Sequence, residues 1–170
     1  MKWPGLTPRP FLYKYNMRQQ QQTLREAYTS LHATIKPNIA LTIKPNNAGI
    51  RSSDQSILSF FKSINTGVCR SLIGTRFDKK QHLHPPALVV IEGAINNRHL
   101  HCSYKIRESD IQKFTDLFDK FCDKNLIAKH HYLFTSQVDP ITSDGWLNYC
   151  TKFLRNYDDS DRIHFFGPVI

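Results

Sequence analysis

Several features that are common in other proteins are missing from this chain, and each absence narrows the choice of function. No C-x-x-C pair occurs, which disfavours a zinc site built from cysteines. No apolar run approaches the length of a membrane span, and the N-terminus lacks the apolar core of a signal peptide. We therefore expect a cytoplasmic protein without a membrane partner. Its four cysteines should be small buried hydrophobic residues in a reducing compartment: Cys69, Cys102, Cys122 and Cys150.

Acidic residues are also scarce, because 14 Asp and Glu face 23 Lys and Arg, and the formal net charge is +9. A strongly basic chain favours a polyanionic partner, most simply a nucleic acid. A merely solvated basic surface or an anionic membrane surface would explain the charge as well, although no polybasic amphipathic helix stands out. Charge alone leaves these alternatives open.

Hydrophobic periodicity places the secondary structure along the 170 residues. A leading helix ends before Pro37, and the later elements follow in the order β-α-β-β-α-β-α, with a short closing strand at 162–166. This order predicts an α+β fold whose antiparallel sheet has split βαβ, ferredoxin-like topology, with helices on one face and an extra N-terminal helix. We expect an N-terminal arm and helix at 1–37 and a catalytic or binding domain at 38–170.

Two His-Leu-His triplets compete as a candidate site. His82 and His84 run into two prolines, in a loop that offers nothing to hold their rings. His99 and His101 lie two residues apart in an expected strand, so both project from one face of the sheet. Glu92 lies on the partner strand, opposite His101 or close to it. Glu92, His99 and His101 form an N,N,O ligand set that suits Mg²⁺ or Mn²⁺, with Zn²⁺ as an alternative. An ordinary polar sheet face explains the hairpin equally well.

A second group of residues lies in the last expected helix, "DGWLNYCTKFLRN". Tyr149 and Lys152 are three residues apart and are therefore neighbours on one flank of that helix. A tyrosine beside a lysine can act as a nucleophile, because the cation favours the phenolate. Tyr157 has no lysine at the equivalent position, and three aspartates follow it closely. Taken alone, an ordinary boundary tyrosine with a solvated lysine explains the pair better.

Together the motifs resemble the HUH endonucleases, and specifically the single-tyrosine initiators of rolling-circle replication. The resemblance rests on "ALTIKP", then "VVIEG" before "HLHC", then "YCTK", and it runs from about residue 39 to 156. It implies that Glu92, His99 and His101 bind the metal, that Tyr149 is the nucleophile and that Lys152 assists near the phosphate. The leading helix and arm depart from the family pattern.

The resemblance implies a nickase that cuts and rejoins single-stranded DNA through a 5′-phosphotyrosine intermediate. Its partners would be single-stranded DNA or an origin hairpin, and a helicase from the host, because the chain has no G-x-x-x-x-G-K-[ST] loop for ATP. Two alternatives remain open. One is a single-tyrosine transposase with the same chemistry, and the other is a sheet that binds single strands without cutting them.

Overall fold

The computed structural model describes residues 24–45, 53–94, 97–128, 134–152, 154 and 161–168. A leading helix covers 24–35 of these residues. The further helices and strands are β1 Ile39–Pro45, α2 Asp54–Ile73, β2 Ala87–Glu92, β3 His99–Tyr104, α3 Ile111–Ala128, β4 Phe134–Pro140, α4 Gly145–Thr151 and β5 Ile163–Phe166. Short 3₁₀ turns lie at η1 Phe77–Lys79, η2 Gln81–Leu83 and η3 Glu108–Asp110.

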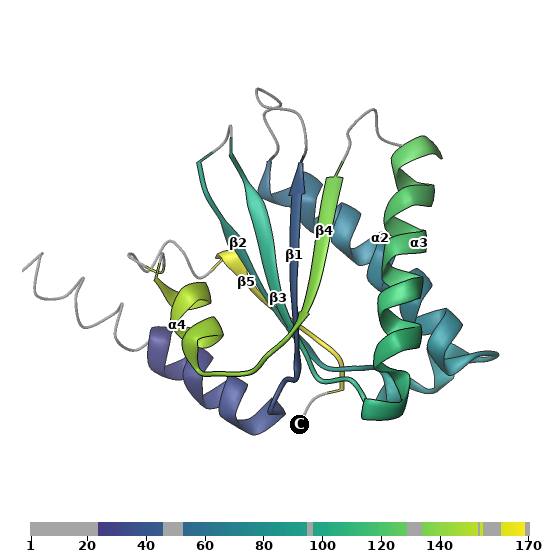
Figure 1. Ribbon diagram of the computed structural model, residues 1–170, viewed down its shortest axis with the longest axis horizontal. Helices are drawn as coiled ribbons and strands as arrows, with labels where there is room; N and C mark the ends of the chain where they lie inside the picture. The colour runs from purple at the N-terminus through teal and green to yellow at the C-terminus, as the bar shows by residue number, and fades with distance from the viewer. Residues whose placement is uncertain are drawn as a thin grey trace, which may run out of the picture.

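The five strands form one antiparallel sheet in the order β4-β1-β3-β2-β5. α2 joins β1 to β2, although β3 lies between these two strands, and α3 joins β3 to β4, although β1 lies between them. This α+β arrangement is consistent with the ferredoxin-like fold that the sequence predicts. β3 is therefore the middle strand, with β1 on one side and β2 on the other, and it carries His99 and His101 (Figure 1).

One face of the sheet packs against α2 and α3 and forms the larger hydrophobic core. Side chains from alternate strand positions enter this core, among them Val89, Ile91, Leu100 and Cys102. Leu100 and Cys102 thus point away from the two histidines of the same strand, as the sequence predicts. Ser53 caps α2, because its hydroxyl accepts a hydrogen bond from the Ser56 amide at 3.0 Å.

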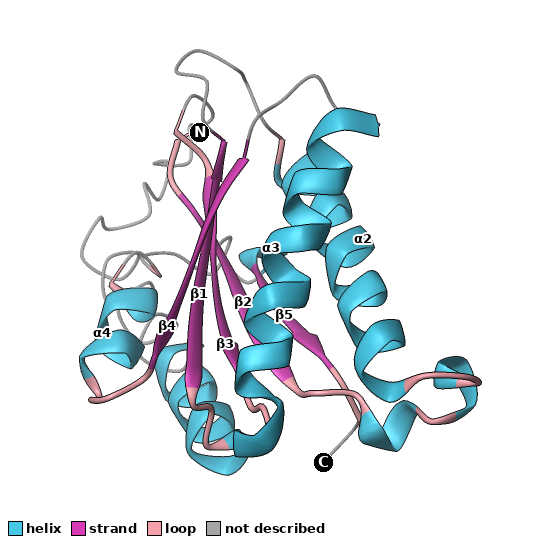
Figure 2. Cartoon of the chain, turned by 45° about the vertical axis from the view of Figure 1, so that its right-hand side comes forward, coloured by secondary structure: helices cyan, strands magenta, loops and turns pink. Residues whose placement is uncertain are grey.

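The opposite face is not open, and this corrects the prediction that helices cover only one side. The leading helix and α4 pack there in a second core that contains Tyr28, Leu88, Val90, Cys150 and Leu154. Figures 1 and 2 show α4 on the side of the sheet away from α3. The physical reason lies in β2, all of whose residues are buried. A strand that is apolar at consecutive positions must be covered on both faces.

All four cysteines are buried and free, in agreement with their expected role as small hydrophobic residues. Among the described residues, no helix combines the length and the apolar character needed to cross a membrane. The division at residue 37 stays a prediction. The leading helix nevertheless shares its core with β2 and α4, because Tyr28 and Ile35 are buried in it.

Candidate metal centre

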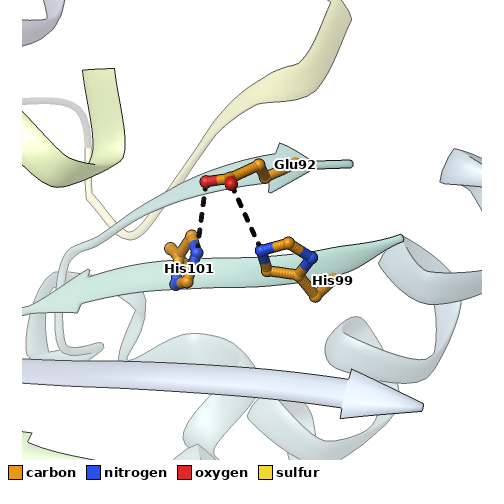
Figure 3. A group of neighbouring side chains, drawn as sticks. All are labelled: Glu92, His99 and His101. Carbon is orange, nitrogen blue, oxygen red and sulfur yellow. Dashed lines mark ion pairs between the residues drawn. The ribbon is translucent and has the colours of Figure 1, made fainter. Parts of the chain in front are cut away.

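Glu92, His99 and His101 meet on the face of the sheet that α4 partly covers (Figure 3). The register pairs Glu92 with His99 and places His101 opposite Val90, two residues further along. Glu92 Oε1 lies 3.4 Å from His99 Nε2, and Glu92 Oε2 lies 3.3 Å from His101 Nε2. The sequence predicts that Glu92 lies opposite His101 or close to it, and the register places it two positions away, opposite His99. The face is the same, because side chains alternate with a period of two.

The backbone of the β2–β3 turn fixes the protonation of His99. Its Nδ1 lies 2.9 Å from the carbonyl oxygen of Asn97. A carbonyl oxygen only accepts hydrogen bonds, so Nδ1 carries the proton and donates it. In the neutral ring, Nε2 then turns its lone pair towards Glu92. Such a carbonyl partner is what commonly orients a metal-binding histidine.

His101 is nearly inaccessible, with 2% of its surface exposed. Its Nδ1 forms a hydrogen bond of 3.0 Å with the hydroxyl of Thr42, the residue opposite it on β1. Burial lowers the pKa of His101 to about 3, and the neighbouring His99 and Lys152 act in the same direction. His101 is therefore neutral at pH 7, and its attraction to Glu92 is not that of an ion pair.

Burial also acts on Glu92, which is 5% exposed. It raises the pKa of the carboxyl group, and the nearby His99 and Lys152 oppose this effect. Neither Glu92 Oε2 nor His101 Nε2 has a hydrogen-bond partner among the described residues. Two buried polar atoms that face each other without a hydrogen bond are unfavourable, and a cation bound between them would use both as electron-pair donors.

The donor set fits a divalent metal ion. One ligand atom from each of Glu92, His99 and His101 lies within 4.8 Å of the other two. A bound cation would satisfy the two unpaired acceptors and would leave coordination positions for substrate or water. The structure thus favours a metal centre over an ordinary polar sheet face. A polar face exposed to solvent would not require a carboxylate to be buried between two imidazoles.

α4 brings the tyrosine and the lysine to this centre. The ring of Tyr149 lies 4.9 Å from the ring of His101, centroid to centroid. Lys152 Nζ lies 3.9 Å from Glu92 Oε1 and 3.4 Å from the centre of the Tyr149 ring. Tyr149 is 41% exposed, so its side chain reaches both the ligands and the surface. All five residues selected from the sequence therefore lie together, although their catalytic roles stay predictions. Tyr157 lies outside the described residues.

The other triplet is placed quite differently. His84 stacks on Phe77 with ring centres 5.4 Å apart, and its Nε2 lies 3.0 Å from the Phe77 carbonyl oxygen. His82 is exposed in η2. Both precede β2, whereas Glu92 ends that strand. This agrees with the interpretation of His82 and His84 as solvated or packed histidines.

Sequence reasoning assigned no role to several neighbours of the centre. Thr42 holds His101, and the Asn97 carbonyl holds His99. Trp146, expected only as part of a buried stripe, packs edge-on against His101 at 5.4 Å and donates a hydrogen bond of 2.8 Å to Ser103. A polar residue between Leu41 and Ile43 was a usable signal for Thr42, whereas a backbone carbonyl leaves none in the sequence.

Neither the models of known protein families nor the curated proteins give a match to this chain. The resemblance to HUH endonucleases therefore continues to rest on the motifs and on the geometry of the five residues.

Proposed function

We propose that this protein is a metal-dependent nuclease that nicks and rejoins single-stranded DNA through Tyr149. The observation that carries the proposal is that a candidate metal site and a candidate nucleophile lie next to each other. A ligand set for a divalent ion and a partly exposed tyrosine lie side by side, with their rings 4.9 Å apart at His101 and Tyr149. In this proposal Mg²⁺ or Mn²⁺ is the ion, with phosphate and water oxygens completing the coordination beside the Glu92 carboxylate, and Zn²⁺, which imidazoles suit, is the alternative.

The transfer step begins with attack of the Tyr149 oxygen on the scissile phosphorus. The Tyr149 O–P bond forms while the bond from phosphorus to the 3′ oxygen breaks. The hydroxyl proton of Tyr149 passes to water, the leaving oxygen takes up a proton from water and becomes a free 3′-OH, and the 5′ side stays on the enzyme as a phosphotyrosine. The tyrosyl ester retains the energy of the bond, so a later 3′-OH can reverse the step and join strands.

An ion held by Glu92, His99 and His101 would supply a Lewis acid for a non-bridging oxygen of the phosphate. The chain itself supplies the positioning. The Asn97 carbonyl and the Thr42 hydroxyl fix the two imidazoles, and Lys152 brings a positive charge between Glu92 and the tyrosine ring. That charge stabilises the negative charge that develops on the attacking and leaving oxygens.

Because helices cover part of the second face of the sheet, they limit where single-stranded DNA can bind. Leu88 and Val90 lie under the leading helix and α4, so the strand cannot lie across the whole sheet. In our proposal it crosses the region where His99 and Tyr149 reach the surface. The net charge of +9 supports binding to phosphates. The released 3′-OH would serve the initiation of rolling-circle replication, with unwinding by a host helicase.

The test is incubation of the protein with a mixed pool of single-stranded oligonucleotides and Mn²⁺, followed by a denaturing gel. We expect a covalent protein–DNA band in the wild type that EDTA abolishes. Sequencing the captured strands gives the site, and hairpin ends among them would favour the transposase alternative. Strand binding without any covalent band, at every metal tested, would refute nicking and leave a non-cleaving binding module.

A further inference from the structure

The leading helix, for which the sequence suggests no role, lies along the helix that carries Tyr149 (Figure 1). Two contacts and one longer-range charge interaction connect the two helices. Arg25 donates a hydrogen bond of 3.4 Å to the carbonyl of Lys152, at the end of α4. Tyr28 packs with Cys150 and Leu154 in one buried cluster. At the start of α4, burial lowers the pKa of His32 while the nearby Asp144 carboxylate opposes that shift.

α4 has little stability of its own. It contains seven residues, begins at Gly145, and has no side-chain hydrogen bond at its N-cap, Asp144. Helices this short do not persist in water without tertiary contacts, and glycine lowers helix stability further. Its contacts with the sheet include the Trp146–Ser103 hydrogen bond and the fully buried Cys150. Docking against the leading helix adds to this support.

We propose that the leading helix is part of the catalytic apparatus, and that Leu24, Arg25 and Tyr28 are positioning residues that hold α4 beside the metal centre. This inference rests on the proposed role of Tyr149 as nucleophile. The positioning residues are not among the proposed ligands. Leu24 and Tyr28 also pack on the cluster that includes Leu88 and Val90 of β2, and we assign their effect on Tyr149 to their contacts with α4.

Loss of the contacts between the leading helix and α4 should slow the covalent transfer to Tyr149 without weakening the binding of metal or single-stranded DNA. Glu92, His99 and His101 belong to β2 and β3, so a weakened contact between the helices leaves the ligand set in place. Tyr149 and Lys152 move with α4. Variants of the positioning residues should therefore bind metal and single strands as the wild type does, while the covalent step becomes slower.

The chain offers a matched pair of substitutions for this test. Leu24 packs against the cluster beneath α4, whereas Leu31, on the same helix, is 38% exposed. Leu24→Ala and Leu31→Ala remove the same atoms with the same change in helix propensity. Arg25→Ala removes only the hydrogen bond to Lys152 and disturbs no core residue, and Arg25→Lys restores the charge.

Two readouts are measured on the full chain. In a Trp3→Phe background Trp146 is the only tryptophan, so its emission reports the docking of α4 without DNA or metal. The single-turnover rate of covalent adduct formation reports the chemistry. For Leu24→Ala we expect red-shifted emission and a rate about tenfold lower, with unchanged affinities for Mn²⁺ and single strands. Arg25→Ala should shift both readouts in the same direction, Arg25→Lys should lie nearer the wild type, and Leu31→Ala should change neither.

The outcomes distinguish this inference from the proposed function. If the wild type forms no adduct but Leu24→Ala alone shifts the Trp146 emission, the support of α4 stands and the nickase proposal fails. If Leu24→Ala and Leu31→Ala behave alike in both readouts, the leading helix does not position α4. A parallel loss of Mn²⁺ affinity in Leu24→Ala would also overturn the inference, because it would show a general rather than a positional effect.

Discussion

Replacement of Glu92 by glutamine should have opposite effects on stability with and without metal. Burial raises the pKa of Glu92 above its ordinary value of 4.5. The folded protein therefore binds a proton more tightly than the unfolded chain does, and the free energy of unfolding falls as the pH rises from about 4.5 through the raised value. Without metal, the cost of ionising this buried carboxylate thus lowers the stability at neutral pH relative to acidic pH. Glu92→Gln removes that charge and should not destabilise the metal-free protein.

With metal bound, we expect the wild type to be more stable than Glu92→Gln. A ligand at one hundred times its dissociation constant raises the free energy of unfolding by about 2.7 kcal/mol. For a chain of this size that corresponds to a rise in Tm of roughly 5–10 °C. The wild type should show this rise with Mn²⁺. Glu92→Gln loses the anionic ligand, because an amide oxygen is a weaker donor, and should show little of it.

The assay is thermal unfolding at pH 7 in EDTA and in Mn²⁺, repeated in EDTA below pH 4.5. Glu108→Gln is the matched control, since Glu108 is exposed in η3, which follows the end of β3 that lies away from the β2–β3 turn. It should match the wild type in each buffer. The advantage of Glu92→Gln in EDTA should disappear at the lower pH, where wild-type Glu92 is protonated. If Glu92→Gln is strongly destabilised in EDTA, or keeps the full Mn²⁺ shift, Glu92 is a structural ion-pair partner and not a ligand.

Four further outcomes are expected. Tyr149→Phe should abolish the covalent adduct on a denaturing gel while leaving strand affinity nearly unchanged; an adduct that persists would place the nucleophile elsewhere. His101→Ala should remove Mn²⁺ binding by calorimetry and His82→Ala should not, and the reverse pattern would mean that the wrong triplet was chosen. Gly93→Ala should weaken both folding and metal binding, because Gly93 has φ of +94° and a Cβ there would collide with the Asn97 carbonyl; wild-type melting and affinity would contradict the proposed turn. Strand binding in EDTA should fall steeply with salt as counterions are released, and a flat salt dependence would argue against a nucleic-acid partner.

The elements and the ligand set could be predicted from local patterns. Leu100 and Cys102 alternate with His99 and His101, and such alternation fixes the face of a strand regardless of its partners. The exact pairing of Glu92 could not be obtained in this way. A turn centred on Asn96 and Asn97 would pair Glu92 with His101, but the left-handed Gly93 starts the turn earlier. Glu92 is paired with His99, two residues from His101. A difference of two residues changes the residue opposite Glu92 but keeps its side chain on the same face of the sheet.

The prediction that helices cover only one face rests on the amphipathicity of the helices. The sequence of β2 indicates instead that both faces need cover. "ALVVI" has no polar residue at alternate positions, and Leu88 and Val90 need cover as much as Val89 and Ile91 do. The two helices that supply this cover, the leading helix and α4, lie more than fifty residues before and after β2 in the chain. Contacts between such distant segments have no local signature, so the sequence predicts that a cover is needed but not which element provides it.

The three proposed ligands and the proposed nucleophile differ in how far apart they lie along the chain. Glu92, His99 and His101 all belong to one hairpin, whereas Tyr149 joins them from a segment 48 residues beyond His101. Local contacts form early in folding, and distant contacts form late and open first. We therefore expect the proposed metal site to form during folding before Tyr149 reaches its place beside it. A partly opened molecule, with α4 detached, would hold the ion and leave the strand intact, so incomplete folding yields an inactive binder and not an uncontrolled nuclease.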